Sequence, residues 1–68
     1  MPLEDISLID ERQLAETLGM ALQTIRNWRH TGHGPAYLKI GGRSVRYRLV
    51  DVREFVERQR IVPDGSEN

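Results

Sequence analysis

The sequence predicts a small, mainly α-helical domain with one β-hairpin, in the order α-α-β-β-α. Two segments with the apolar spacing of helices come first, two short alternating segments joined by glycines follow, and a third helical segment comes last. The 68 residues have room for one small core, since a chain of this length buries only about 60% of its unfolded surface. We expect the domain to span residues 9–60, after an N-terminal arm (1–8) and before a disordered C-terminal tail (61–68).

The first two helices are predicted over residues 11–18 and 22–31. Asp10 is suited to cap the first helix, and Gln13 stands at the third helical position, where its side chain completes a capping box. Gly19 is expected to end this helix in a left-handed conformation. In the second helix, apolar residues mark the buried side, and polar or basic side chains leave the other side free to bind a partner.

The hairpin is predicted after Gly32-His33-Gly34-Pro35, through which a helix cannot continue. Leu38 and Ile40 alternate with Lys39, and Val45 and Tyr47 alternate with Arg46 and Arg48. Gly41-Gly42-Arg43-Ser44 forms the expected turn. This pattern places Tyr47 on the inward side of the hairpin and the basic residues Lys39, Arg46 and Arg48 at outward positions. Tyr37, just before the hairpin, has two interpretations: it caps the core or its hydroxyl contacts a phosphate.

A third helix is predicted to begin at Asp51, which would serve as its N-cap with Glu54 in the capping-box position. Val50 and Phe55 have the spacing of a hydrophobic staple around this start. The expected core stripe of the helix consists of Val52, Phe55 and Val56.

The charges of the chain are segregated although the formal net charge is zero. Residues 17–50 contain no acid and carry +6, whereas residues 1–16 carry −4 and residues 51–68 carry −2. A basic central block with acidic ends is typical of a surface that binds a polyanion. The alternative is a solvated face whose cations pair with carboxylates of the flanking helices.

Two helices joined by a short turn, with polar side chains on the second, are the arrangement of a helix-turn-helix, in which the second helix enters the DNA major groove. Counting from Glu11, Ala15 lies where the helices cross closely and Gly19 lies in the turn. The expected interior positions are Leu14, Leu18, Met20, Ile25 and Trp28. With the hairpin as a wing, the predicted fold class is a winged helix-turn-helix.

The predicted DNA contacts form three groups. The major-groove group on the second helix comprises Leu22, Gln23, Arg26, Asn27 and His30, because Arg can bridge guanine O6 and N7 and Asn or Gln can bridge adenine N6 and N7. Leu22 has two interpretations, contact with a thymine methyl or packing under the hairpin. The backbone group, expected to reach phosphates, comprises Thr24, Arg29, Lys39, Arg46 and Arg48. The wing group for the minor groove comprises Arg43 and Ser44 at the hairpin tip. Arg46 and Arg48 could instead pair with Glu16 or Glu54.

The sequence resembles the excisionase-like and related small winged-helix regulators of phages and plasmids, which share a core with MerR-type DNA-binding domains. The resemblance covers residues 9–58 and rests on Leu14–Met20, Thr24–Trp28, Gly34-Pro35, Leu38–Tyr47 and Asp51-Val52. It implies that the second helix enters the major groove while the wing grips the minor groove, through Gln23, Arg26, Asn27 and Arg43. One departure is Ala21, where many members of the family have a serine or threonine that caps the second helix.

Excisionase-like proteins bind adjacent sites near a recombination junction, bend the DNA and direct a recombinase towards excision. The resemblance therefore implies an architectural factor that binds double-stranded DNA, associates cooperatively with itself on that DNA and has a phage-type integrase as its partner. A MerR-type sensor would continue into a dimerisation helix and an effector domain, for which 68 residues leave no room. A transcriptional repressor or activator of phage or plasmid genes, using the same fold, is the alternative.

Other classes of function find little support in the sequence. No cysteine is present and no nucleophile motif surrounds a serine, so we expect no enzyme, cofactor or small-molecule ligand. His30 and His33 make a weak metal-ligand set, since no acid lies between residues 17 and 50. No apolar run approaches about 20 residues, and the acidic N-terminus is unlike a signal peptide. We expect a cytoplasmic protein that is associated with the nucleoid when bound to DNA and has no membrane partner.

Overall fold

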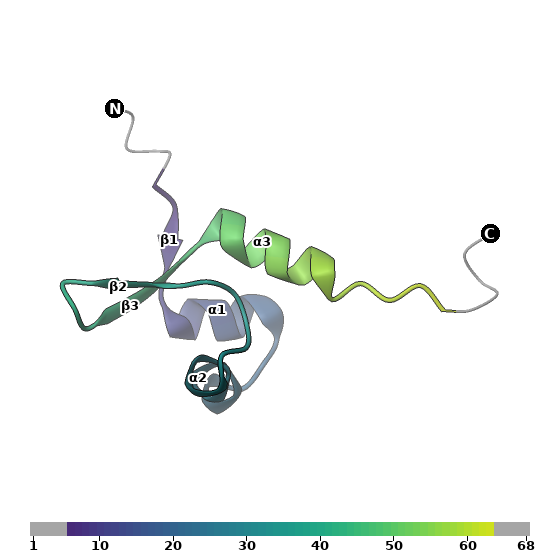
Figure 1. Ribbon diagram of the computed structural model, residues 1–68, viewed down its shortest axis with the longest axis horizontal. Coiled ribbons are helices and arrows are strands. Elements are labelled where there is room, and N and C mark those ends of the chain that lie inside the picture. The colour runs from purple at the N-terminus through teal and green to yellow at the C-terminus, as the bar shows by residue number, and fades with distance from the viewer. Residues whose placement is uncertain (1–5, 64–68) are drawn as a thin grey trace.

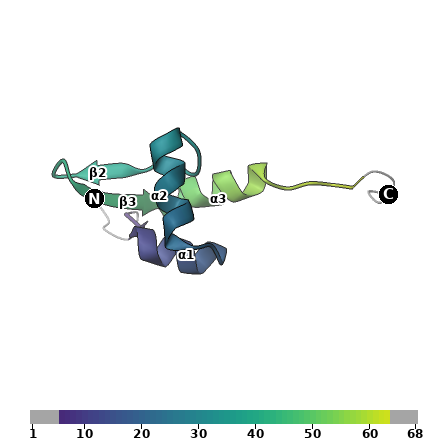
Figure 2. The same ribbon diagram turned by 90° about the horizontal axis from the view of Figure 1, so that it is seen from below.

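The computed structural model describes residues 6–63, which form three helices and a small antiparallel sheet. In chain order the elements are β1 (Leu8–Ile9), α1 (Glu11–Leu18), α2 (Leu22–Thr31), β2 (Leu38–Ile40), β3 (Ser44–Arg48) and α3 (Leu49–Arg58). The hairpin of β2 and β3 extends to one side of the domain and α3 to the other (Figure 1). Seen from below, α2 crosses in front of the base of the hairpin (Figure 2). The predicted fold class is confirmed.

The helices α1 and α2 have the predicted bounds. At the start of α1, the Asp10 carboxylate accepts a hydrogen bond from the Gln13 backbone N–H at 2.8 Å. Gln13 Oε1 accepts one from the Asp10 backbone N–H at 2.9 Å, so the capping box is confirmed. Gly19 ends α1 with a φ of 67°. Ala21 occupies the N-cap position of α2 and provides no side-chain hydrogen bond, in contrast to Asp10.

The core is formed by five buried residues from the first two helices, the sheet and α3. They are Leu14, Ala15, Ile25, Tyr47 and Val52, with Ile9, Leu18, Trp28 and Val45 packed against them. The interior position predicted for Met20 is wrong, because its side chain is 40% exposed. Met20 lies in the turn between α1 and α2, where no helix directs its side chain towards the core.

The central strand of the sheet is β3, which pairs with β1 on one edge and with β2 on the other. Leu8 lies opposite Arg48, and Ile9 lies opposite Tyr47. The sequence pattern does not predict β1, because two residues are too few to show alternation. Leu8, which we expected in the N-terminal arm, thus belongs to the sheet; residues 1–5 of that arm lie outside the described part of the chain.

The register of the hairpin differs from the one that the sequence suggests. Lys39 lies opposite Val45 and therefore shares a face of the sheet with Val45 and Tyr47, so its predicted outward position is wrong. Leu38 and Ile40 lie on the other face, where they are 39% and 47% exposed.

The length of the turn explains this difference. Ile40 pairs with Ser44, so the turn consists of Gly41, Gly42 and Arg43 and is one residue shorter than the predicted turn. A register shift of one residue moves every side chain of a strand to the opposite face.

The start of α3 also differs from the prediction. The helix begins at Leu49, directly after β3, with Arg48 in the N-cap position and no side-chain cap. Asp51 lies in the first turn and accepts hydrogen bonds from Arg48 at 2.8 and 3.0 Å, so the predicted N-cap at Asp51 and the capping box with Glu54 are wrong. Pairing of β3 with β1 extends the strand to Arg48 and leaves no loop in which Asp51 could act as a cap.

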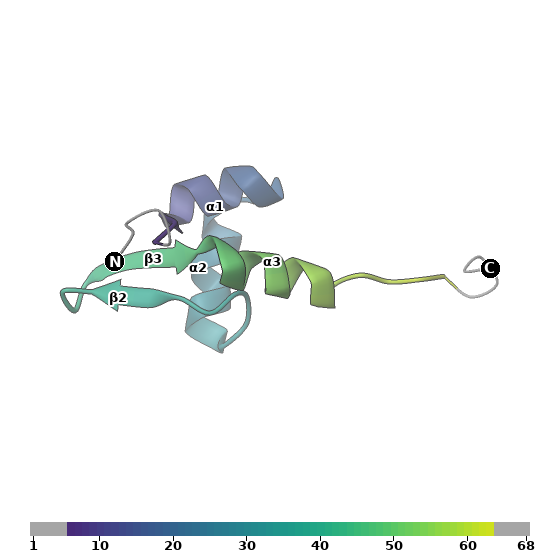
Figure 3. The same ribbon diagram turned by 90° about the horizontal axis from the view of Figure 1, so that it is seen from above.

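The buried side of α3 is narrower than predicted. Val52 is buried and the Phe55 ring packs against Trp28 of α2 with ring centroids 5.3 Å apart, whereas Val56 is 44% exposed. Figure 3 shows α3 continuing the direction of β3. Val56 lines an open apolar hollow with Leu18 and Trp28, which does not cover it fully. Residues 61–63 of the expected tail are in neither helix nor strand, and residues 64–68 lie outside the described residues.

Candidate nucleic-acid interface

Four side chains of α2 lie on one exposed face of the helix. Gln23, Arg26, Asn27 and His30 are spaced as i, i+3, i+4 and i+7, and all four are exposed, while Ile25 on the opposite face is buried. Gln23 Nε2 donates a hydrogen bond to Asn27 Oδ1 at 3.0 Å, which keeps the two amides side by side. The structure thus brings together four of the five residues predicted for the major groove.

The two remaining predicted residues of the first turn of α2 are half-buried. Leu22 and Thr24 flank the exposed face, one on each side. Partial burial of Leu22 is compatible with both of its interpretations, and its contact with DNA stays a prediction.

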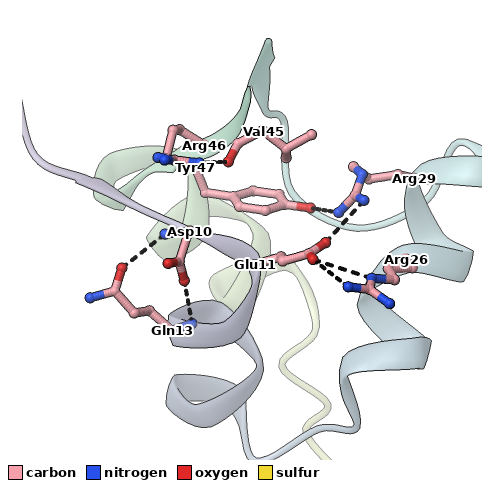
Figure 4. Close-up of polar contacts among 8 residues, drawn as sticks. All are labelled: Asp10, Glu11, Gln13, Arg26, Arg29, Val45, Arg46 and Tyr47. Atoms are coloured by element: carbon pink, nitrogen blue, oxygen red, sulfur yellow. Dashed lines mark hydrogen bonds and ion pairs between the residues drawn. The ribbon is translucent and has the colours of Figure 1, made fainter. Parts of the chain in front are cut away.

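A polar network joins the start of α1 to α2 and β3 (Figure 4). Glu11 Oε2 accepts hydrogen bonds from Arg26 Nη2 at 2.8 Å and Nε at 3.2 Å, and Glu11 Oε1 accepts one from Arg29 Nη2 at 3.1 Å. Arg29 Nη1 donates to the hydroxyl of the buried Tyr47 at 3.1 Å. One carboxylate therefore bridges two arginines of the second helix.

The network also shifts the pKa values of Glu11 and Arg26. The hydrogen bond from Arg26 is the main cause that holds the pKa of Glu11 below its ordinary value of 4.5, although partial burial acts in the opposite direction. The same hydrogen bond raises the pKa of Arg26. Glu11 is therefore an anion at neutral pH, and it neutralises part of the positive charge of α2.

Arg29 has an internal role that the sequence does not reveal. Its side chain is only 19% exposed, against 45% for Arg26, and its guanidinium lies 5.9 Å from the centroid of the Tyr37 ring. The Tyr37 ring in turn lies 6.1 Å from that of Tyr47. The phosphate contact predicted for Arg29 stays a prediction, and Arg29 also fixes the helix against the sheet.

The exposed edge of α2 and the hairpin enclose a shallow depression, called here the α2–hairpin depression. Its lining residues are Arg26, Arg29, His30, Tyr37, Lys39, Arg43 and Val45. Four of them are permanent cations and none is an acid. The register of the hairpin is the reason that Lys39 faces this depression. A helix and a hairpin of this shape, sharing a basic concave surface, match the elements that dock on two grooves of duplex DNA.

Comparison with protein families agrees with this geometry. The family model described as "Helix-turn-helix domain" matches residues 8–60, more than half of the chain. The chain belongs to this family. Helix-turn-helix domains of this kind are excisionase-like small DNA-binding domains and are typically non-enzymatic. The protein is thus a sequence-specific DNA-binding domain. No curated protein and no solved structure matches the chain.

In this helix-turn-helix protein the hairpin takes the place of the wing. Arg43 is exposed at its tip, after two glycines with φ values of 67° and 83° that let the chain reverse. Ser44 is the first residue of β3 and is half-buried. Arg43 lines the α2–hairpin depression, so the wing tip and the second helix present cations to a common space.

Two predicted backbone contacts lie apart from that space. Arg46 is half-buried and its Nη1 donates to the Val45 carbonyl at 2.7 Å. Arg48, with a side chain 54% exposed, is paired with Asp51 and lines a separate hollow at the start of α3. Neither arginine pairs with Glu16 or Glu54 among the contacts of the described residues. Of the basic hairpin residues, Lys39 and Arg43 line the α2–hairpin depression, whereas Arg46 lines a neighbouring hollow that also includes Arg29, Arg43 and the acid Glu11.

Two structural observations concern other kinds of site. Within residues 6–63, no three His, Cys, Asp or Glu side chains gather as a metal site would require. No helix in that part of the chain is long and apolar enough to cross a membrane.

Proposed function

We propose that this protein is an excisionase-type architectural factor, which binds and bends attachment-site DNA and directs a phage-type integrase towards excision. The observation that carries the proposal is the α2–hairpin depression, in which cations of the second helix and of the wing face the same space. Its lining includes no acid, and Glu11 pairs with only two of its four cations, Arg26 and Arg29. The matching family of excisionase-like small DNA-binding domains supports it.

The proposed binding mode assigns a groove to each element. The exposed face of α2 enters the major groove, where Arg26 reads a guanine and the paired amides of Gln23 and Asn27 read adenines. The wing tip, with Arg43, reaches the neighbouring minor groove, and Lys39 contacts the phosphates between the two grooves. A module held in two adjacent grooves gains contacts when the duplex curves around it, which favours bending.

Binding of several copies side by side is part of the proposal. A single module of this kind covers about 600–1,000 Å² of protein surface on DNA, which gives modest specific affinity. Each copy presents one second helix and one wing, so adjacent sites occupied cooperatively would supply the affinity that one copy lacks. We expect a protein that is monomeric when free and assembles on its DNA.

The test is a gel-shift and footprint titration on DNA that flanks the nearest integrase attachment site. Arg26→Ala is expected to weaken specific binding by about 5- to 150-fold, the range for loss of a bidentate base contact. Arg43→Ala is also expected to weaken specific binding, because it removes the proposed contact of the wing tip with the minor groove. Arg58→Ala is the matched control, since it removes an exposed arginine from the last turn of α3, the helix that runs away from the hairpin (Figure 1).

The outcomes distinguish the proposal from its alternative. We expect stepwise, cooperative shifts over repeated sites beside the attachment core. Both test variants should weaken these shifts, and the control should not. A single footprint over a promoter would instead indicate a transcriptional regulator. No shift at low salt would contradict DNA binding by this surface.

A further inference from the structure

Glu11 is the first residue of α1, and its carboxylate lies against the face of α2 that is proposed to read DNA. An acid in the first turn of a helix ordinarily stabilises that helix through its dipole. Here both carboxylate oxygens are used instead by arginines of another helix, 15 and 18 residues further along the chain. The local role of Glu11 in α1 thus does not account for its contacts.

The contact with Arg26 leaves part of the guanidinium available. Glu11 Oε2 takes the Nε and Nη2 groups of Arg26, and among the described residues no hydrogen bond is made by Nη1. The Arg26 side chain is still 45% exposed. An arginine that bridges guanine O6 and N7 needs two N–H groups, which the edge formed by Nη1 and the second hydrogen of Nη2 can supply. Glu11 and a guanine can therefore bind the same guanidinium together.

We propose that Glu11 is a positioning residue for base recognition, which holds Arg26 in one orientation and thereby contributes to the choice of sequence. The inference rests on the proposed entry of α2 into the major groove. A free arginine loses rotamer freedom when it docks on a base, at a cost of up to about tenfold in the binding constant. In the unbound protein Glu11 already restricts Arg26, because Glu11 is itself held by Arg29, which donates to its other carboxylate oxygen and to the Tyr47 hydroxyl.

The same carboxylate weakens attraction to any DNA. Its negative charge lies within about one Debye length of phosphates at the docked surface, so it opposes binding irrespective of sequence. Removal of the charge therefore has two effects of opposite sign: random-sequence DNA binds more tightly, while discrimination at the base pair read by Arg26 falls. A carboxylate that merely blocked Arg26 would, when removed, tighten specific and random binding alike.

The experiment compares wild type, Glu11→Gln and Glu11→Ala in selections from a randomised DNA duplex library. For each protein, the affinities for the selected duplex and for a random-sequence duplex are then measured. Glu16→Gln is the matched control, because Glu16 is an exposed acid on the same helix, and its carboxylate makes no ion pair among the described residues. Glu11→Gln keeps the size of the side chain, and circular dichroism checks that each variant is folded.

We expect both Glu11 variants to bind the random duplex a few-fold more tightly and to lose about tenfold in the ratio of selected to random affinity. The loss of discrimination should be confined to one or two positions of the selected sequence. General destabilisation of the protein would instead affect all positions. Glu16→Gln should leave the ratio unchanged. An unchanged ratio in folded Glu11→Gln would overturn the positioning role alone, whereas a wild-type protein that selects no sequence would overturn the proposed function as well.

Discussion

Gly34 lies in the segment that leads from α2 to the hairpin, and its replacement by alanine tests how that segment is held. Its φ is +84°, and a Cβ built on it would lie 2.9 Å from Trp28 Cε3 and 3.0 Å from Trp28 Cβ. Gly32 has a nearly identical φ of +81°, but a Cβ there would meet no atom within 4 Å. The two glycines therefore have a similar left-handed φ, which strains any substitution, and they differ in the steric contact with Trp28.

The difference between the two variants isolates the contact. A left-handed backbone costs a residue with a Cβ about 1–2 kcal/mol, which is the expected loss for Gly32→Ala. Gly34→Ala should lose a further 1–3 kcal/mol or so, the usual cost of overpacking, because the Trp28 ring is backed by Phe55 and cannot withdraw freely. A domain of this size has only about 3–10 kcal/mol of stability, so the second variant should be close to unfolding at 37 °C.

Urea unfolding at 25 °C, followed by circular dichroism, measures both free energies of unfolding. Thermal melts should show the same order, with about 4–8 °C for each kcal/mol. Equal losses for Gly34→Ala and Gly32→Ala would refute the reasoning, since Trp28 would then yield without cost and could not fix the hairpin against α2.

Three further predictions concern the cap, the network and the wing. Ala21→Ser should raise the free energy of unfolding by about 0.5–1 kcal/mol in urea titrations, because the hydroxyl supplies the missing cap of α2. The pKa of Glu11 is lowered below 4.5 in the folded state, so its ion pairs stabilise the fold above that pH and are lost as the pH falls through the lowered pKa. Glu11→Gln should thus be less stable than wild type at pH 7, and the difference in the free energy of unfolding should narrow as the pH falls below 4.5. Lys39→Ala should reduce the slope of log K against log salt in binding titrations by about 0.9, whereas Arg58→Ala should leave it unchanged.

Each of these predictions has an outcome that contradicts it. An Ala21→Ser variant no more stable than wild type would mean that solvent already satisfies the first N–H groups of α2. A gap between wild type and Glu11→Gln that is constant with pH would show that the ion pairs of Glu11 contribute nothing to stability. A salt slope unchanged by Lys39→Ala would place that lysine away from the phosphates.

The elements that the sequence predicts correctly are those defined by neighbouring residues. The bounds of α1 and α2 follow from Asp10 and Gln13 at one end and from glycines at the others, all within a few residues of the helices that they delimit. The start of α3 depends instead on pairing between β3 and β1, which are about 40 residues apart in the chain, and no local pattern reports that pairing. The hairpin register likewise depends on one residue of turn length, to which the alternation of side chains is insensitive.

The candidate site shows the same division. The exposed face of α2 could be predicted because helical spacing alone separates Gln23 and Arg26 from Ile25. Glu11 could not, since an acid at the first position of a helix has an ordinary explanation and its link to Arg26 exists only in three dimensions. The position of Lys39 beside α2 could not be predicted either, because it depends on the register.

The direct passage of β3 into α3 has a mechanical consequence. Arg48 ends the strand and Leu49 begins the helix, so no flexible linker separates the two elements. The five residues of β3 form a stiff arm of about 17 Å, with the hairpin turn at one end and α3 at the other, held near its base where Tyr47 pairs with Ile9. In the proposed complex, a displacement of the hairpin tip by DNA would therefore be passed along β3 to the first turn of α3, because no loop between the two elements can absorb it.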